Sequence, residues 1–218
     1  PSRAPAGQVG NIYSRYNHVS FSRSSIANNR INFRRINYKL LGAAIFYATN
    51  EIRSKFRLSR FKYSRVLYKA AFMHSRDMVR YKFMGHYSPI ASKRTPSMRV
   101  RMFGRWIRTV GENVASTFGI QYKPGQSFFP PRRPGGVFRN SRTRQPIPAH
   151  TYMSFARFVL SRWMQSPGHR RNILNPRFKV LGAAAVYFAE GRYRFPKFKA
   201  TQVFAGGTND EMFVGRER

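Results

Sequence analysis

Apolar residues recur every three or four positions in three stretches of the chain, a spacing that predicts amphipathic helices. In residues 40–55 the apolar stripe consists of Leu41, Ala44, Ile45, Ala48 and Ile52. In residues 65–82, where Ser64 can cap the first turn, it consists of Leu67, Ala70, Ala71, His74 and Met78. In residues 150–165 it consists of Tyr152, Phe155, Ala156, Val159 and Trp163. A shorter helix is predicted over residues 97–107, around Met98, Met102 and Trp106.

Two later stretches alternate with the period of two that is typical of strands, residues 177–189 and 192–205, and the turn Ala189–Arg192 lies between them. Residues 111–118 are interpreted as a buried passage from a turn into a strand. The chain is therefore expected to form one α+β domain with extensions. No run of about 18 apolar residues occurs, so the sequence predicts no membrane-spanning helix.

Residues 1–38 are predicted to form a basic N-terminal arm. They show no helical period, and isolated aromatic residues alternate with arginines, namely Arg15, Arg23, Arg30, Arg34 and Arg35. Such a segment could fold onto a partner or wrap its own domain, and the alternative is a disordered basic tail. The aromatic content favours the arm because it provides side chains to bury.

Residues 119–149 are dense in proline and glycine, which predicts a loop without regular secondary structure. A loop of about 30 residues inside a compact domain is uncommon and is usually functional or disordered. We interpret it as a partner-binding insertion rather than a passive loop, with candidate binding residues Arg132, Arg133, Arg139, Arg142 and Arg144. The C-terminal residues 207–218 form a polar tail.

The charge of the chain points to an anionic partner. There are 41 Lys and Arg residues against 7 Asp and Glu, a formal net charge of +34, and 31 of the basic residues are arginines. Arginine favours bidentate contacts to phosphate, sulfate or carboxylate groups. A surface that is basic only for solubility is the alternative, but such a surface would adhere to any polyanion it met. The chain has no cysteine, which excludes a disulfide scaffold and a thiolate metal site.

Five motifs in this order resemble the CAP superfamily of cysteine-rich secretory, antigen five and pathogenesis-related proteins, in its cysteine-free bacterial-type SCP branch. They are Asn50–Arg53, Leu67–Met78, Phe83–Pro89 (FMGHYSP), Gly111–Ala115 (GENVA) and Trp163–Leu174, which contains SPGH. The resemblance covers about residues 40–206. It implies a three-layer α-β-α sandwich over residues 39–206, with the N-terminal arm before it and the 119–149 insertion within it.

The resemblance also implies a central cleft in which His86, His169 and Glu112 gather. Two imidazoles could hold zinc, and Glu112 could act as a general base or orient a ligand. The position of the second acidic residue of the family is occupied by Phe158, between Arg157 and Arg162, so the site is expected to be incomplete. The alternative to a catalytic site is therefore a vestigial one, in which Glu112 hydrogen-bonds a histidine or the backbone and holds loops together.

These observations lead to three hypotheses. The first is a non-catalytic binding or scaffold subunit that engages an acidic protein or an anionic envelope polymer and carries no cofactor. The second is a hydrolase that uses His86, His169 and Glu112, with zinc as the candidate metal. The third is a nucleic-acid binder, because arginines interleaved with Phe and Tyr suit phosphate contacts and base stacking. The family resemblance and the start at Pro1 favour a secreted, periplasmic or surface protein whose signal peptide has been removed.

Overall fold

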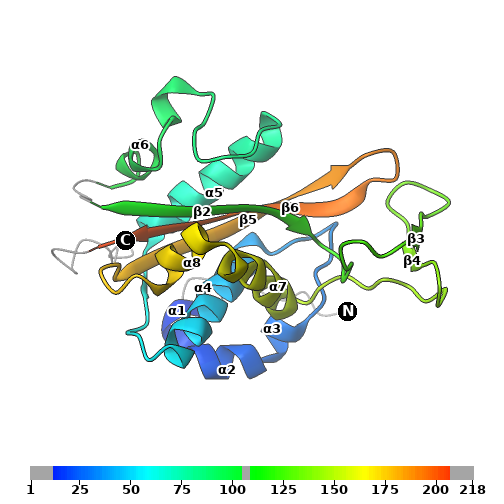
Figure 1. Cartoon of the computed structure of the whole chain (residues 1–218), viewed down its shortest axis with the longest axis horizontal. Helices are drawn as coiled ribbons and strands as arrows, with labels where there is room; N and C mark the ends of the chain where they lie inside the picture. Colours follow the sequence, from blue (N-terminus) through cyan, green and yellow to red (C-terminus); the bar gives the residue numbers. More distant parts are fainter. Residues whose placement is uncertain (1–11, 105–108, 207–218) are drawn as a thin grey trace.

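A four-stranded sheet runs through the middle of the molecule (Figure 1) in the computed structural model, which describes residues 12–104 and 109–206. Its strands are β1 (Lys62–Tyr63), β2 (Val110–Phe118), β5 (Val180–Glu190) and β6 (Phe195–Ala205). They are ordered β1-β5-β6-β2, with β1 parallel to β5 and the other neighbours antiparallel. The two predicted C-terminal strands are thus confirmed, and the predicted passage at 111–118 is the edge strand β2.

Helices cover both faces of this sheet (Figure 1). On one face lie α5 (Arg65–Arg80) and α6 (Pro96–Arg101), the latter preceded by the 3-10 helix η2 (Ala91–Lys93). On the other face lie α4 (Tyr38–Lys55), α7 (Tyr152–Gln165) and α8 (Pro167–Leu174). The predicted three-layer α-β-α sandwich is confirmed. Among the described residues, no helix is both long enough and apolar enough to cross a membrane.

The residues of β5 alternate between the two helical layers. One set joins the core shared with α4 and α7: Leu181, Ala183 and Ala185. The other set faces α5: Val180, Gly182 and Ala184. At Gly182 a Cβ atom would lie 2.0 Å from the backbone nitrogen of Tyr68. The strand has glycine at this position because the backbone of α5 packs directly against it.

The N-terminal segment is part of the same core, and it is helical although its sequence shows no helical period. It forms three short helices, α1 (Ile12–Arg15), α2 (His18–Arg23) and α3 (Ser25–Asn28). Phe21 is fully buried, and the Tyr47 hydroxyl of α4 shares its single proton between the carbonyls of Ile12 and Tyr16. Each helix has at most six residues, too few to show a period, and α2 and α3 begin at the capping residues Asn17 and Ser24. From residue 12 onward, the arm wraps its own domain.

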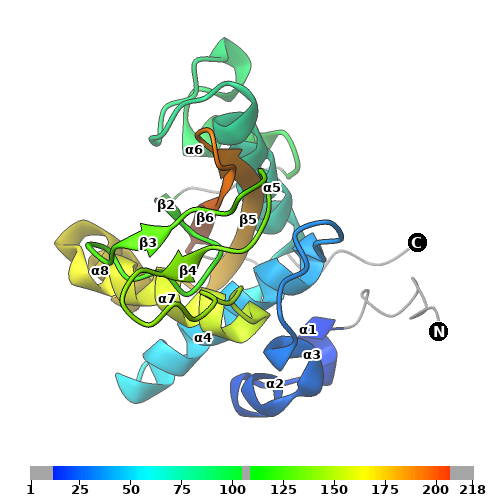
Figure 2. The same cartoon turned by 90° about the vertical axis from the view of Figure 1, so that its right-hand side faces the viewer.

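Residues 119–149, which we call the basic hairpin, project from one end of the sandwich (Figure 1), and this end faces the viewer in Figure 2. The expectation of no regular structure is wrong here, since β3 (Phe128–Phe129) pairs antiparallel with β4 (Arg139–Asn140). A small hydrophobic core supports the pair, formed by the buried residues Ile120, Phe138 and Ile147 with Phe33, Tyr122, Phe128 and Phe195 around them. Aromatic side chains thus hold a segment whose proline and glycine content predicts a loop.

The helix predicted over residues 97–107 is shorter than expected. It is α6, which begins at Pro96 after the capping residue Thr95 and ends at Arg101. Trp106, one of the apolar residues on which the prediction was based, lies outside the described residues. The predicted helix extends beyond the observed end at Arg101 because Met102 keeps the helical spacing of apolar residues. The Met102 side chain is exposed, however, and does not pack against the core.

His150, just before α7, should make stability depend on pH. Its ring is buried against Phe158, and burial lowers its pKa to about 4. An unfolded histidine titrates near pH 6.5, so protonation favours the unfolded chain. The contribution is fully present above pH 6.5 and is lost as pH falls to about 4, at a cost of about 3 kcal/mol. Urea unfolding at pH 7 and pH 4 should show a larger loss of stability for the wild type than for His150→Gln. Equal losses would contradict this.

Candidate functional site

The carboxylate of Glu112 is at the centre of the site implied by the family resemblance. Strand β2 carries Glu112 on the face that packs against α5 and α6, and its side chain is only 1% exposed. His86, in the loop after α5, donates a hydrogen bond from Nδ1 to Oε1 of Glu112 at 3.0 Å. The second oxygen, Oε2, accepts a hydrogen bond from Nη2 of Arg99 at 2.8 Å. Both carboxylate oxygens are therefore engaged by side chains of this chain.

Arg99 was not foreseen from the sequence, yet it is the cation of the site. Its side chain is 1% exposed and extends from α6 beneath the loop that carries His86. Besides its ion pair with Glu112, it donates to the carbonyls of Lys93 at 2.8 Å, Arg94 at 3.2 Å and His86 at 2.9 Å. The guanidinium therefore fixes the 86–94 loop to β2. Nothing in the sequence distinguishes this arginine from the other 30.

His74 completes the group that we call the Glu112 cluster: His74, His86, Arg99 and Glu112. It is fully buried on α5, where its Nε2 donates to the carbonyl of Gly85 at 2.9 Å and lies 3.7 Å from Oε1 of Glu112. Burial lowers the pKa of His74, Arg99 lowers it further, and Glu112 opposes both effects. His74 is a hydrogen-bonded core residue, as its place on the apolar stripe predicts.

His169 approaches the Glu112 cluster from the other helical layer. It lies in the first turn of α8, where Ser166 is at the N-cap position and Pro167 follows, although the Ser166 hydroxyl makes no capping bond. Asn113 of β2 donates a hydrogen bond to the carbonyl of His169 at 3.1 Å. Burial lowers the pKa of His169, and the neighbouring His86 lowers it further. The structure therefore brings His86, Glu112 and His169 to one edge of the sheet.

These residues do not fit a zinc site. A permanent positive charge, the Arg99 guanidinium, already pairs with the Glu112 carboxylate, and this would oppose a second cation. Within the described ranges 12–104 and 109–206, no three His, Cys, Asp or Glu side chains are grouped so that they could hold a metal ion. At the position of the missing second acid, Phe158 packs between His150 and Phe118. The arrangement is a buried ion pair that joins a loop to a strand.

Several residues of the family-like motifs hold the backbone of distant segments together. The Asn50 amide group bonds both the N–H and the carbonyl of Phe61. Arg53 is fully buried and donates to the carbonyls of Ile173 and Asn175 at the end of α8. The Trp163 indole N–H donates to the carbonyl of Val114 at 3.1 Å. These motif positions therefore serve the fold, and their presence does not indicate catalysis.

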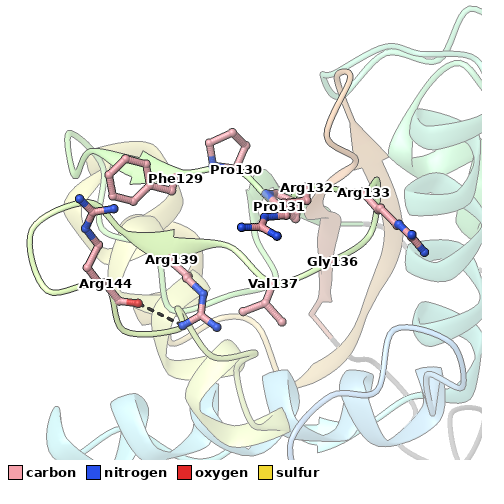
Figure 3. A pocket seen from close by; sticks show the side chains of 9 residues that line it. All are labelled: Phe129, Pro130, Pro131, Arg132, Arg133, Gly136, Val137, Arg139 and Arg144. Atoms are coloured by element: carbon pink, nitrogen blue, oxygen red, sulfur yellow. Dashed lines mark hydrogen bonds between the residues drawn. The ribbon is translucent and has the colours of Figure 1, made fainter.

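A second candidate site lies on the basic hairpin. Its outer face forms a pocket of about 600 Å³, and four arginines line this pocket: Arg132, Arg133, Arg139 and Arg144. Figure 3 shows Arg144 beside Phe129 at one end, Arg133 at the other end, and Arg132 and Arg139 between them. Arg142 is exposed on the same hairpin. Among the described residues, none of these five arginines has a carboxylate partner.

The predicted arginines of the N-terminal arm are all exposed, but only some of them lie near the hairpin. Arg30 donates to the carbonyl of Ala149 at 2.8 Å, and Phe33 packs onto the hairpin core. Arg34 and Arg35 follow directly and are exposed. The structure thus places the stretch 30–35 beside the base of the basic hairpin, whereas no contact connects Arg15 or Arg23 with it in the described part of the chain.

The few carboxylates of the described residues are all engaged with basic partners. Glu51 pairs with Arg157, Asp77 with Lys93, Glu112 with Arg99, and Glu190 with Lys197. No acidic residue occurs between Glu112 and Glu190, a stretch that contains the whole basic hairpin. The positive charge of the hairpin is therefore not balanced from within the described fold.

The three-layer sandwich, together with the hydrogen bonds from Asn50, Arg53 and Trp163 to the backbone of distant segments, defines a CAP-type domain. The chain belongs to the CAP family, described as the cysteine-rich secretory protein family, whose model matches residues 46–204. It contains no cysteine, consistent with the cysteine-free bacterial-type SCP domains.

Several bacterial proteins are similar to this chain. The chain is 28% identical over 138 residues to the uncharacterized protein YkwD of Bacillus subtilis, an alignment that covers 63% of this chain and 39% of that protein. An extracellular SCP-domain protein of Bacillus anthracis has a similar structure, with a TM-score of 0.51, 24% identity, and coverage of 78% of this chain and 41% of that one. An outer surface protein of Borrelia burgdorferi has a TM-score of 0.51, 14% identity, and coverage of 83% of this chain and 99% of that one. The chain thus spans about two fifths of the length of the two Bacillus proteins.

Proposed function

We propose that this chain is a non-catalytic binding or scaffold subunit, which engages an acidic protein or an anionic polymer through its basic hairpin. The observation that carries the proposal is the set of exposed arginines on the hairpin, which lack carboxylate partners in the described fold and stand on an aromatic core. Because the hairpin is already packed, binding would cost little ordering entropy. The sandwich serves as the platform.

The Glu112 cluster supports a non-catalytic role. A general base must reach the proton that it abstracts, but both oxygens of Glu112 are bonded within the protein and its side chain is buried. Removing either bond would disturb the 86–94 loop rather than free a catalytic group. The hydrolase hypothesis would require Arg99 to leave Glu112, and nothing in the arrangement favours that.

We further propose that the protein acts outside the cytoplasm, as a secreted, periplasmic or surface protein. The B. anthracis relative is described as extracellular and the B. burgdorferi relative as an outer surface protein. An anionic envelope polymer or an acidic subunit of a surface assembly would be available to the hairpin in such a location.

Two charge-matched variants test the role of the hairpin on heparin and polyglutamate columns at low salt. One variant replaces four hairpin arginines by glutamine: Arg132, Arg133, Arg139 and Arg142. The other replaces four exposed arginines elsewhere: Arg60, Arg65, Arg76 and Arg171. We expect the hairpin variant to elute at clearly lower salt than the control variant, although both lose the same charge. Equal elution, or a wild type that fails to bind either column, would overturn the proposal.

A further inference from the structure

The two phenylalanines of β3 point in opposite directions. Phe128 packs into the hairpin core against Phe138, with ring centroids 5.5 Å apart. Phe129 is on the outer face, where it lines the pocket and remains 39% exposed. Successive residues of a strand face opposite sides, so packing Phe128 against the hairpin core places Phe129 outward. Strand β3 therefore holds the Phe129 ring toward solvent, while the Phe128 ring on its other face anchors the strand to the hairpin core.

Arginines surround this exposed ring. Arg139 of β4 is the direct cross-strand partner of Phe129 and so shares its face of the hairpin. The guanidinium carbon of Arg144 lies 4.4 Å from the centre of the Phe129 ring. Arg139 also donates to the Arg144 carbonyl at 3.1 Å, which fixes the two arginines relative to each other. A flat apolar surface and several cations thus occur in one pocket.

We propose that this pocket binds single-stranded nucleic acid, with a base stacked on the Phe129–Arg144 pair and phosphates held by Arg132, Arg133 and Arg139. The inference rests on the proposed function, since it names the polyanion that the hairpin engages. Base–aromatic stacking beside a positively charged groove is the general means by which proteins hold single strands. The pocket, at about 600 Å³, lies within the usual range for binding sites.

An anionic polymer without flat apolar groups would match the pocket less well. Its anionic groups could pair with the arginines, but nothing in a carboxylate or phosphodiester chain would cover the Phe129 ring. Val137, which lines the same pocket, is 56% exposed, so the apolar part extends beyond one ring. A ligand that carries flat apolar groups along an anionic chain can contact both the apolar side chains and the arginines of the pocket. A polynucleotide has this chemistry.

Two oligomers with equal numbers of phosphates test the inference by fluorescence anisotropy at low salt. One is a 12-residue oligothymidylate, and the other is the same chain with abasic sites throughout. A stacked base should make the oligothymidylate bind about 5- to 150-fold more tightly than the abasic chain. Phe129→Ala should remove this difference and leave abasic binding unchanged, whereas Phe129→Trp should keep it.

Phe56 provides a matched control, because it is 45% exposed, carries Arg170 at 5.1 Å over its ring, and lies outside the hairpin. Phe56→Ala should bind both oligomers as the wild type does. An oligouridylate arm tells whether RNA or DNA is preferred, and tighter binding of either supports the inference. Equal binding of the oligothymidylate and the abasic chain, or tighter binding of polyglutamate than of both, would overturn it while the proposed function stands. Failure of every polyanion to bind would instead overturn the proposed function.

Discussion

Replacing Arg99 by methionine is expected to destabilise the protein by about 3–5 kcal/mol, the usual cost of removing one partner of a buried ion pair. The substitution leaves the buried Glu112 carboxylate without its cation and removes the hydrogen bonds that Arg99 donates to three backbone carbonyls of the 86–94 loop. Methionine retains most of the side-chain volume, so the loss should reflect charge and hydrogen bonding rather than a cavity. Urea unfolding at pH 7 measures the change in the free energy of unfolding.

Two further variants separate this effect from general damage to α6. Arg101→Met, on the same helix but exposed, should change stability by less than about 0.5 kcal/mol. The double variant Arg99→Met/Glu112→Gln should be more stable than Arg99→Met alone, because it no longer buries an unpaired charge. If Arg99→Met costs no more than Arg101→Met, Arg99 is not the cation that neutralises Glu112.

Gly182→Ala is expected to destabilise the protein at or above the upper end of the usual range for overpacked cores, about 3 kcal/mol or more. The added methyl group would lie 2.0 Å from the Tyr68 nitrogen and 2.2 Å from the carbonyl carbon of Leu67. Both atoms belong to the backbone of α5, so no side-chain rotation can relieve the overlap and the helix must move away from the sheet. Thermal or urea unfolding of the variant provides the measurement.

Gly168→Ala is the matched control for this prediction. Gly168 lies in the first turn of α8, and a Cβ atom there would meet no atom within 4 Å apart from its chain neighbours and the backbone of its own helix. Alanine should therefore be neutral or stabilise the protein by about 0.4–1 kcal/mol. If the two alanine variants prove equally stable, α5 does not pack as closely on β5 as described.

The sequence was sufficient to predict the elements of the sandwich because their apolar residues are regularly spaced. The ends of α5 and α7 lie within two residues of the predicted bounds. The spacing underestimated how much of the surface of α4 is buried. This helix is buried on nearly all sides because the N-terminal segment covers the face opposite the sheet. A single apolar stripe indicates one packed face, and it carries no information about a segment that folds back from elsewhere.

The candidate site was only partly predictable. Family-like motifs identified His86, Glu112 and His169, and the structure does bring them together. The role of Arg99 depends on tertiary contacts, since its partners Glu112 and His86 are each 13 residues away in the chain. The hairpin was misjudged for a related reason: its core draws on Phe33 and Phe195, which lie outside the segment and leave no local pattern.

The salt dependence of polyanion binding tests the central claim most directly, because it counts phosphate contacts without regard to base stacking. For a single-stranded oligonucleotide, the slope of log K against log salt changes by about 0.7 for each phosphate contact. We predict that the variant with glutamine at Arg132, Arg133, Arg139 and Arg142 has a slope shallower than that of the wild type by about 2, because three of these arginines, Arg132, Arg133 and Arg139, hold phosphates in the proposed complex. The charge-matched variant at Arg60, Arg65, Arg76 and Arg171 should remain close to the wild type. If both variants change the slope equally, the basic hairpin is not the binding surface.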